Sequence, residues 1–139
     1  MKKKSFGYGE ETTNYFPLPN EIYTLDLSAG EIAVYGYLLY CEDRKTYKCH
    51  PSYKTIGKAI KMSKNTVRKY IKSLEKKRLI NTEPTKIICK DGRQNNGSLL
   101  YTINPIGEAV EYNFAFQLRR NEEIRRKESF KKKFEKFGS

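Results

Sequence analysis

The side chains best suited to chemistry in this 139-residue chain are cationic, and they are concentrated in two stretches. Residues 52–78 carry ten Lys and Arg against the single acidic Glu75, and residues 118–139 carry nine against four acidic residues. The rest of the chain is nearly neutral, so the formal charge of +12 belongs to these stretches. Concentrated charge of one sign is costly unless a polyanion offsets it. The pattern predicts a phosphate-rich partner, DNA or RNA first and an anionic membrane surface second, with a merely solvated basic helix as the alternative.

Other kinds of site have little support in the sequence. The only histidine, His50, has no nucleophile or carboxylate at a suggestive spacing, and there is no glycine-rich phosphate loop. Cys41, Cys49 and Cys89 could join His50 around zinc, but the one close pair is adjacent, whereas structural zinc ligands stand two to four residues apart. We therefore expect no enzyme, no metal and no cofactor, and no small-molecule ligand is evident.

The cysteine pattern and the hydropathy bear on the compartment. Three cysteines without a C-x-x-C pair favour a reducing cytosol, and hence a cytoplasmic protein. No apolar run approaches the roughly twenty residues that a bilayer span requires, so we expect no membrane-spanning segment, and nucleic acid rather than a membrane is the expected partner.

Capping residues and apolar spacing indicate three helices. Ser28 and Glu31 form a capping box before a helix over 29–41. Ser52, preceded by a proline, begins a second helix over 53–60, and Ser63 caps a third that starts after a short turn. In the third helix, apolar side chains recur at spacings of three and four, which places them on one side: Val67, Tyr70, Ile71 and Leu74.

After residue 78 the pattern changes to strands. Residues 79–82, 85–90 and 99–103 have the β-branched content of short strands, and the turn-rich 91–97 predicts a hairpin loop between the last two. Residues 106–118 predict a final amphipathic helix. At the other end, the aromatic and proline-rich 15–23 predicts an extended segment that packs its rings on the core.

Residues 51–80 contain a pattern made of Pro51-Ser52, Ile56, Met62-Ser63, Thr66-Val67, Leu74 and Leu79-Ile80. With this pattern they resemble winged helix-turn-helix proteins of bacterial plasmids, phages and other mobile elements, which include the N-terminal domains of replication initiators and of DnaD-like primosomal proteins. One departure is Gly57, where the family usually has alanine, and we expect it to loosen the second helix by about 1 kcal/mol. The resemblance extends over about 15–104.

The resemblance implies an α+β fold, a three-helix core plus a β-hairpin wing, to which this chain adds a C-terminal helix. In this fold the third helix enters the major groove of double-stranded DNA and reads base edges with its N-terminal part. Its polar side therefore supplies the candidate readers, together with the capping Ser63: Lys64, Asn65, Thr66, Arg68 and Lys69.

The remaining candidates would position the DNA backbone. Lys72 and Lys76 lie further along the third helix and would meet phosphates. Arg93 in the wing would enter a minor groove or rest on the backbone. The start of the second helix offers free amides and a positive dipole end to a phosphate, through Ser52, Tyr53, Lys54 and Thr55.

These observations predict a flexible arm over 1–14, a DNA-binding domain over 15–104, and a helix with a basic tail over 105–139. The predicted function is sequence-specific DNA binding as a transcriptional regulator. Two alternatives stay open: a replication or primosome protein of a mobile element, and a protein-interaction module without sequence readout. The apolar stripe of 106–118 either packs on its own domain or pairs with a second copy, so a homodimer is possible, and the state of the tail beyond residue 119 is undecided.

Overall fold

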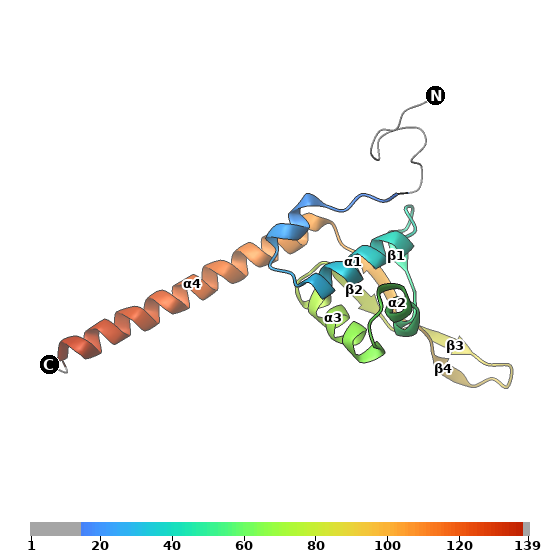
Figure 1. Ribbon diagram of the computed structural model, residues 1–139. Helices are drawn as coiled ribbons and strands as arrows, with labels where there is room; N and C mark the ends of the chain where they lie inside the picture. The colour runs from blue at the N-terminus through green and yellow to red at the C-terminus, as the bar shows by residue number, and fades with distance from the viewer. Residues whose placement is uncertain (1–14, 138–139) are drawn as a thin grey trace, which may run out of the picture.

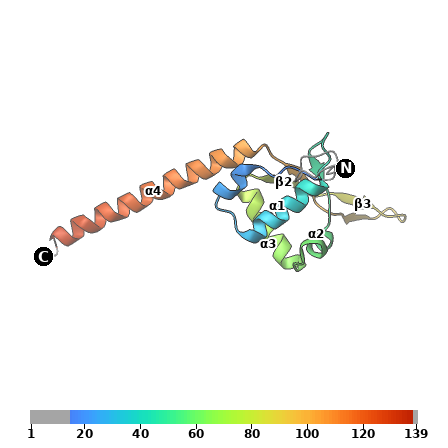
Figure 2. The ribbon, with the colours of Figure 1, turned by 45° about the horizontal axis from the view of Figure 1, so that its top comes forward.

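The computed structural model describes residues 15–137, with side chains up to residue 133. A body of helices and a small sheet carries two projections that leave it in opposite directions, a β-hairpin and one long helix (Figures 1 and 2). No helix in this range has an apolar stretch long enough to cross a membrane. The predicted arm over 1–14 lies outside the described residues. The elements in chain order are η1 Asn20–Thr24, α1 Ala29–Cys41, β1 Lys48–Cys49, α2 Tyr53–Ile60, α3 Lys64–Lys76, β2 Ile80–Glu83, β3 Lys86–Ile88, β4 Gln94–Asn96, β5 Leu100–Ile103 and α4 Ile106–Phe137.

The three predicted helices are confirmed together with their caps. The Ser28 hydroxyl accepts a hydrogen bond from the Glu31 amide at 3.2 Å, and the Glu31 carboxylate accepts one from the Ser28 amide at 3.0 Å. Ser52 and Ser63 cap α2 and α3 in the same way. The turn between these two helices bends at Lys61, whose backbone adopts a left-handed conformation with φ 59°. Helix, short turn and helix are therefore fixed by local chemistry.

The core lies between α1, α2, α3 and the sheet. Because their apolar side chains recur at spacings of three and four, each helix turns one side inward. Helix α3 contributes Val67, Ile71 and Leu74, none more than 1% exposed. The sheet closes the core with side chains that alternate along β5: Tyr101 and Ile103 are buried and their neighbours are partly exposed.

Helix α2 contains Gly57 at a close approach of backbone to backbone. A Cβ built on Gly57 would lie 2.4 Å from the carbonyl oxygen of Met62 in the following turn. The same turn is held by a hydrogen bond from the Met62 amide to the Gly57 carbonyl, at 2.9 Å. The loss of helix propensity at Gly57 is thus a smaller effect than the steric clash that alanine would cause, because the added methyl group would push the turn apart.

The sheet differs from the predicted hairpin. The region over 42–51, for which the sequence predicts no helix or strand, contains β1, and Cys49 there is buried. Strand β5 lies in the middle of an antiparallel three-stranded sheet with the order β1-β5-β2. Strand β3 pairs instead with β4, inside the stretch predicted as a loop. The prediction failed because pairing partners distant in sequence decide which short segments become strands.

A winged helix-turn-helix of the α+β class results, with an additional C-terminal helix, as predicted. The wing, defined here as residues 86–96, extends β2 and β5 into a second, smaller ladder (Figure 1). Its two central isoleucines, Ile87 and Ile88, are 56% and 73% exposed. The wing therefore contributes nothing to the core and is free to meet a partner.

The segment before α1 packs mainly through aliphatic side chains, and among its rings Phe16 is half-buried, with its centre 6.3 Å from that of Tyr40. Ile22 in η1 and Leu25 after it are buried, whereas Tyr15 and Tyr23 are 64% and 73% exposed. The expectation that the aromatic rings of this segment cover the core is thus wrong for both tyrosines. Residues 20–24 form the 3-10 helix η1, so the predicted extended conformation is wrong for this half of the segment, and Ile22 of η1 is buried.

Helix α4 is a single helix of 32 residues, so the basic tail extends it as far as Phe137. Only its first turns touch the body, where Ala109 is buried. The predicted stripe is divided: Ile106 and Ala109 pack on the body, whereas Val110, Phe114 and Leu118 are 39%, 65% and 46% exposed. At a rise of 1.5 Å per residue the helix is about 48 Å long.

Candidate nucleic-acid interface

Helix α3 holds its cationic side in a fixed orientation because its opposite side is buried. The Ser63 hydroxyl accepts a hydrogen bond from the Thr66 amide at 3.2 Å and begins the helix. Along the outward side, the side chains exposed to solvent are Lys64, Asn65, Arg68, Lys69, Lys72 and Lys76. The predicted division of α3 into a core side and a polar side is therefore what the structure shows.

One lysine of this side is supported by a ring. The Lys69 ammonium lies 5.8 Å from the centre of the Tyr70 ring. A cation over an aromatic face gains attraction and loses freedom of movement. The ring therefore restrains Lys69, which lies near the middle of the exposed face, so that its side chain loses less conformational entropy when it binds a partner.

The four hydroxyls predicted at the two helix starts are bonded in pairs. Ser52 and Thr55 share a hydrogen bond of 2.9 Å between their hydroxyls, and so do Ser63 and Thr66. Each pair also closes its N-cap. These hydroxyls therefore cap α2 and α3. Each pair keeps one hydroxyl proton and some lone pairs that could still bond to a partner.

A groove of about 430 Å³ separates the start of α2 from the root of the wing. Lys54 and Lys64, from two different helices, both line it. Helix starts carry unpaired amides and a positive dipole end, which together attract an oxyanion. The structure thus brings predicted residues of α2 and α3 to one place, and adds wall residues that sequence reasoning did not single out: Ile87, Asn96, Gly97, Ser98, Leu99 and Tyr101.

Tyr101 is a special member of this wall. Its side chain is fully buried, and its hydroxyl has no hydrogen-bond partner within residues 15–137. Burial is the main cause that raises the pKa of Tyr101, so the hydroxyl keeps its proton and can donate. Tyr101 lies in the segment 99–103 that the sequence predicts as a strand, but its place beside the groove depends on the pairing of β5.

Arg93 is placed apart from the other candidates, at the turn of the wing. Its side chain is 82% exposed and donates a hydrogen bond of 2.7 Å to the Asp91 carboxylate. Hydrogen bonds from the Arg93 amide and side chain lower the pKa of Asp91. Arg93 is therefore accessible, but part of its hydrogen-bonding capacity is already used.

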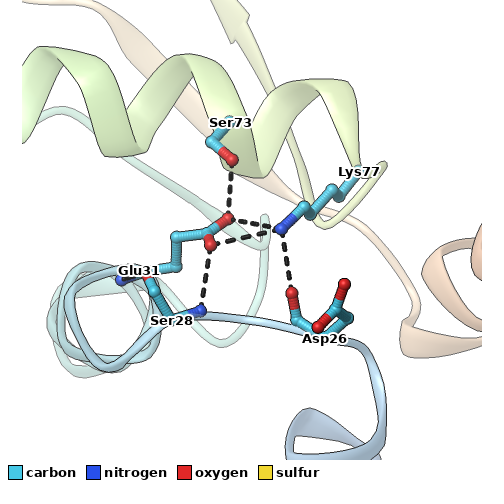
Figure 3. A network of polar contacts seen from close by, with 5 residues as sticks. All are labelled: Asp26, Ser28, Glu31, Ser73 and Lys77. Carbon is cyan, nitrogen blue, oxygen red and sulfur yellow. Dashed lines mark hydrogen bonds and ion pairs between the residues drawn. The ribbon is translucent and has the colours of Figure 1, made fainter.

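A polar network behind α3 ties the helix to the start of α1 (Figure 3). The buried carboxylate of Glu31 accepts hydrogen bonds from the Ser73 hydroxyl at 2.6 Å and from the Lys77 ammonium at 3.2 Å. Lys77 also donates to the backbone carbonyl of Asp26, at 3.0 Å. Burial raises the pKa of Glu31, but the hydrogen bonds from Ser28, Ser73 and Lys77 and the charge of Lys77 outweigh it and lower the pKa.

The lone acidic residue of the basic stretch also has a structural task. The Glu75 carboxylate accepts hydrogen bonds from the Thr82 hydroxyl at 2.8 Å and from the Thr82 amide at 3.3 Å. It joins α3 to β2, and does not interrupt the exposed cationic side. The sequence did not predict that Glu31 and Glu75 support the site, although both hold α3 in place.

The cysteines do not form a metal centre in the described part of the chain. There, no three residues among His, Cys, Asp and Glu are grouped to hold an ion. The Cys49 thiol is buried and contacts the Leu38 carbonyl at 3.6 Å. Burial raises its pKa to about 12, so Cys49 is a protonated core side chain.

The three helices and their caps can now be compared with known domains. Residues 25–80 match the family model of a helix-turn-helix domain. The match runs from the end of η1 through α3 to the first residue of β2. No curated protein sequence matches the chain.

Two solved structures are similar in fold. One is a possible transcriptional regulator from Methanosarcina mazei Go1, at 17% identity and a TM-score of 0.48, over 75% of this chain and 82% of that one. The other is S. aureus MepR in complex with DNA, at 18% identity and a TM-score of 0.41, over 84% of this chain and 82% of that one.

Proposed function

We propose that this chain is a sequence-specific double-stranded DNA-binding protein, a transcriptional regulator rather than an enzyme. The observation that carries the proposal is the one-sided build of α3, with a buried apolar side and an outward side of five cations and Asn65. A helix of this kind fits the major groove, where Asn pairs with adenine and Arg or Lys with guanine. The match to the helix-turn-helix family over residues 25–80 supports it.

The groove between α2 and the wing gives the proposal a second contact. One strand of the duplex backbone would follow this groove, with Lys54 and Lys64 neutralising phosphates. Arg93 would reach the DNA further out, from the wing. The exposed ends of α2, α3 and the wing then contact one duplex together.

Selection of bound fragments from random duplexes, at two ionic strengths, tests the function. We expect a consensus sequence, and an affinity that falls with salt at a log–log slope of about −0.9 for each phosphate neutralised. Binding without a consensus at either salt concentration contradicts sequence readout and favours the protein-interaction alternative. A slope near zero contradicts the phosphate contacts.

We also propose that the protein acts as a homodimer held through α4. The apolar side chains of α4 support this, because they are exposed to water in a single copy and a second copy would cover them. A dimer predicts a near-palindromic operator with half-sites about one helical turn apart. The symmetry of the selected consensus and the mass of the protein in sedimentation equilibrium test it.

A further inference from the structure

One side of α4 carries a row of residues that its own domain leaves uncovered. Val110, Phe114, Gln117, Asn121 and Ile124 follow each other at spacings of four, three, four and three. This spacing gives the period of 3.5 residues at which two helices pack along a seam. Val110, Phe114 and Ile124 are 39%, 65% and 46% exposed, Asn121 is also exposed and Gln117 is half-buried, so most of the seam is open within the described chain.

The side of α4 that meets the body is a different one. Ala109, Tyr112 and Phe116 line a small cleft together with Leu25 and Leu79 of the body. On a helical wheel of 100° per residue, these three side chains lie about 100–160° away from the middle of the seam. The body therefore does not compete for the seam.

Helix α4 also divides into two halves of opposite charge. The near half, residues 106–118, has two acidic residues and no basic one. The far half, residues 119–137, has nine basic residues and four acidic ones. A surface that accepts the near half must be positive, and a surface that accepts the far half must be negative.

We infer that the α4 helices of two copies pair antiparallel, the near half of each on the far half of the other. The inference rests on the homodimer in the proposed function and adds its orientation and register. In this register Phe114 packs on the partner's Ile124, and Gln117 faces the partner's Asn121. Glu111, beside the seam, meets the partner's Arg125.

Electrostatics selects this orientation over the parallel one. A parallel pair places the two far halves side by side, each with an excess of five positive charges. An antiparallel pair places each far half against the acidic Glu108 and Glu111 of the other copy. The amides of Gln117 and Asn121 can bond only in one register, and a polar residue in a seam fixes register in this way.

The register has a consequence for DNA. Its centre lies near residue 119, thirteen residues from the first residue of α4. The two helix starts are then about 39 Å apart at 1.5 Å per residue. One turn of B-DNA measures about 34–36 Å, so the two domains leave the pair at a separation comparable with adjacent half-sites.

Charge reversal in the full chain, without nucleic acid, tests the pairing. Glu111→Lys and Arg125→Glu are each expected to raise the dimer dissociation constant about tenfold, because each turns two symmetric attractions into repulsions. The double variant, Glu111→Lys with Arg125→Glu, is expected to return to within about threefold of wild type. Sedimentation equilibrium gives the constants, and circular dichroism verifies that the helix is kept.

Arg126→Glu is the matched control, since the same charge change falls on the side of α4 away from the seam. It is expected to stay within about threefold of wild type. A chain that is monomeric at every concentration overturns the pairing. A dimer whose double variant is no tighter than the single variants overturns the antiparallel register. A dimer that shows the rescue but no sequence-specific DNA binding leaves the pairing intact and overturns the DNA-binding function.

Discussion

Helices α3 and α4 are both rich in Lys and Arg, but the molecule treats their charges differently. The cations of α3 stand on one side of a helix whose other side is buried in the core. Helix α4 projects away from the body (Figure 2), and the basic side chains between residues 119 and 133 are exposed on all sides of it. Under the proposed function, the cations of α3 read base edges from fixed positions. Those of α4 have no such frame within one copy and act through their charge.

The support behind α3 shows how much structure this fixed position needs. Glu31 and Glu75 bond α3 to α1 and to β2, and the turn at Lys61 sets its angle to α2. Helix α4 has one comparable contact near its root, the Arg78 guanidinium 5.8 Å from the centre of the Tyr112 ring. Precision in α3 thus comes from bonds at its ends and along its back.

Truncation of an apolar side chain is expected to show the largest difference in stability between α3 and α4. Ile71→Ala in α3 should lower the free energy of unfolding by about 2–5 kcal/mol, because it leaves a cavity in the core. Ile124→Ala in α4 should change it by less than about 0.5 kcal/mol in the monomer, because that side chain is exposed. Urea denaturation at low protein concentration measures both. Equal losses would contradict the contrast.

The polar bond behind α3 is expected to give the next largest effect. Glu31→Gln removes the charge that Lys77 and Ser73 meet, and should cost about 1–3 kcal/mol at neutral pH. The exposed Glu123 of α4 is the matched control, and Glu123→Gln should leave stability within about 0.5 kcal/mol. Thermal or urea unfolding of the three proteins compares them.

The same variant carries a pH dependence of definite sign. The pKa of Glu31 in the folded chain lies below its ordinary value of 4.5. Its contribution to stability is therefore complete above about pH 4.5 and is lost as the pH falls through the lowered pKa. Wild type should lose stability more steeply than Glu31→Gln below pH 4.5. Parallel curves would show that the network adds nothing.

The contrast also explains what the sequence could predict. Helix α3 follows from local signals, a capping Ser63 and apolar residues at spacings of three and four. Strand β1 does not, because Lys48 and Cys49 become a strand only by pairing with Thr102 and Tyr101 of β5. Strand β4 consists of Gln94–Asn96 and likewise exists through its partner β3. The two residues of β1 and the three residues of β4 have no strong preference for strand by themselves.

The candidate site divides in the same way. Exposure of the α3 cations was predictable from the helical period, and the capping serines were predictable from their position. The neighbourhood of Lys54, Lys64 and Tyr101 was not, because it depends on where β5 returns beside α2. The continuation of α4 to residue 137 was left undecided, although its Glu, Lys and Arg content and the absence of Gly and Pro favour helix.

Substitutions in α3 and in α4 should affect DNA binding in different ways: the first should change sequence discrimination, and the second only the overall affinity. Asn65→Ala is expected to cost about 1–3 kcal/mol of discrimination at particular base pairs. Arg126→Ala in α4 should weaken all sequences equally or leave them unchanged, and alter the salt slope by at most about 0.9. Binding to the selected consensus and to its point variants, over a salt series, measures both. Uniform weakening by Asn65→Ala would remove the reading role of α3.

The last prediction concerns two helical glycines, of which Gly107 gives the smallest expected effect. Nothing lies within 4 Å of a Cβ built on Gly107 in α4. Gly107→Ala should therefore raise the free energy of unfolding by up to about 1 kcal/mol, since alanine favours the helix and nothing obstructs it. Gly57→Ala in α2 should lower it, because the added methyl group meets the Met62 carbonyl at 2.4 Å. Urea denaturation of both variants measures the signs: opposite signs show that packing governs the α2–α3 unit and propensity the root of α4, and equal signs refute that division.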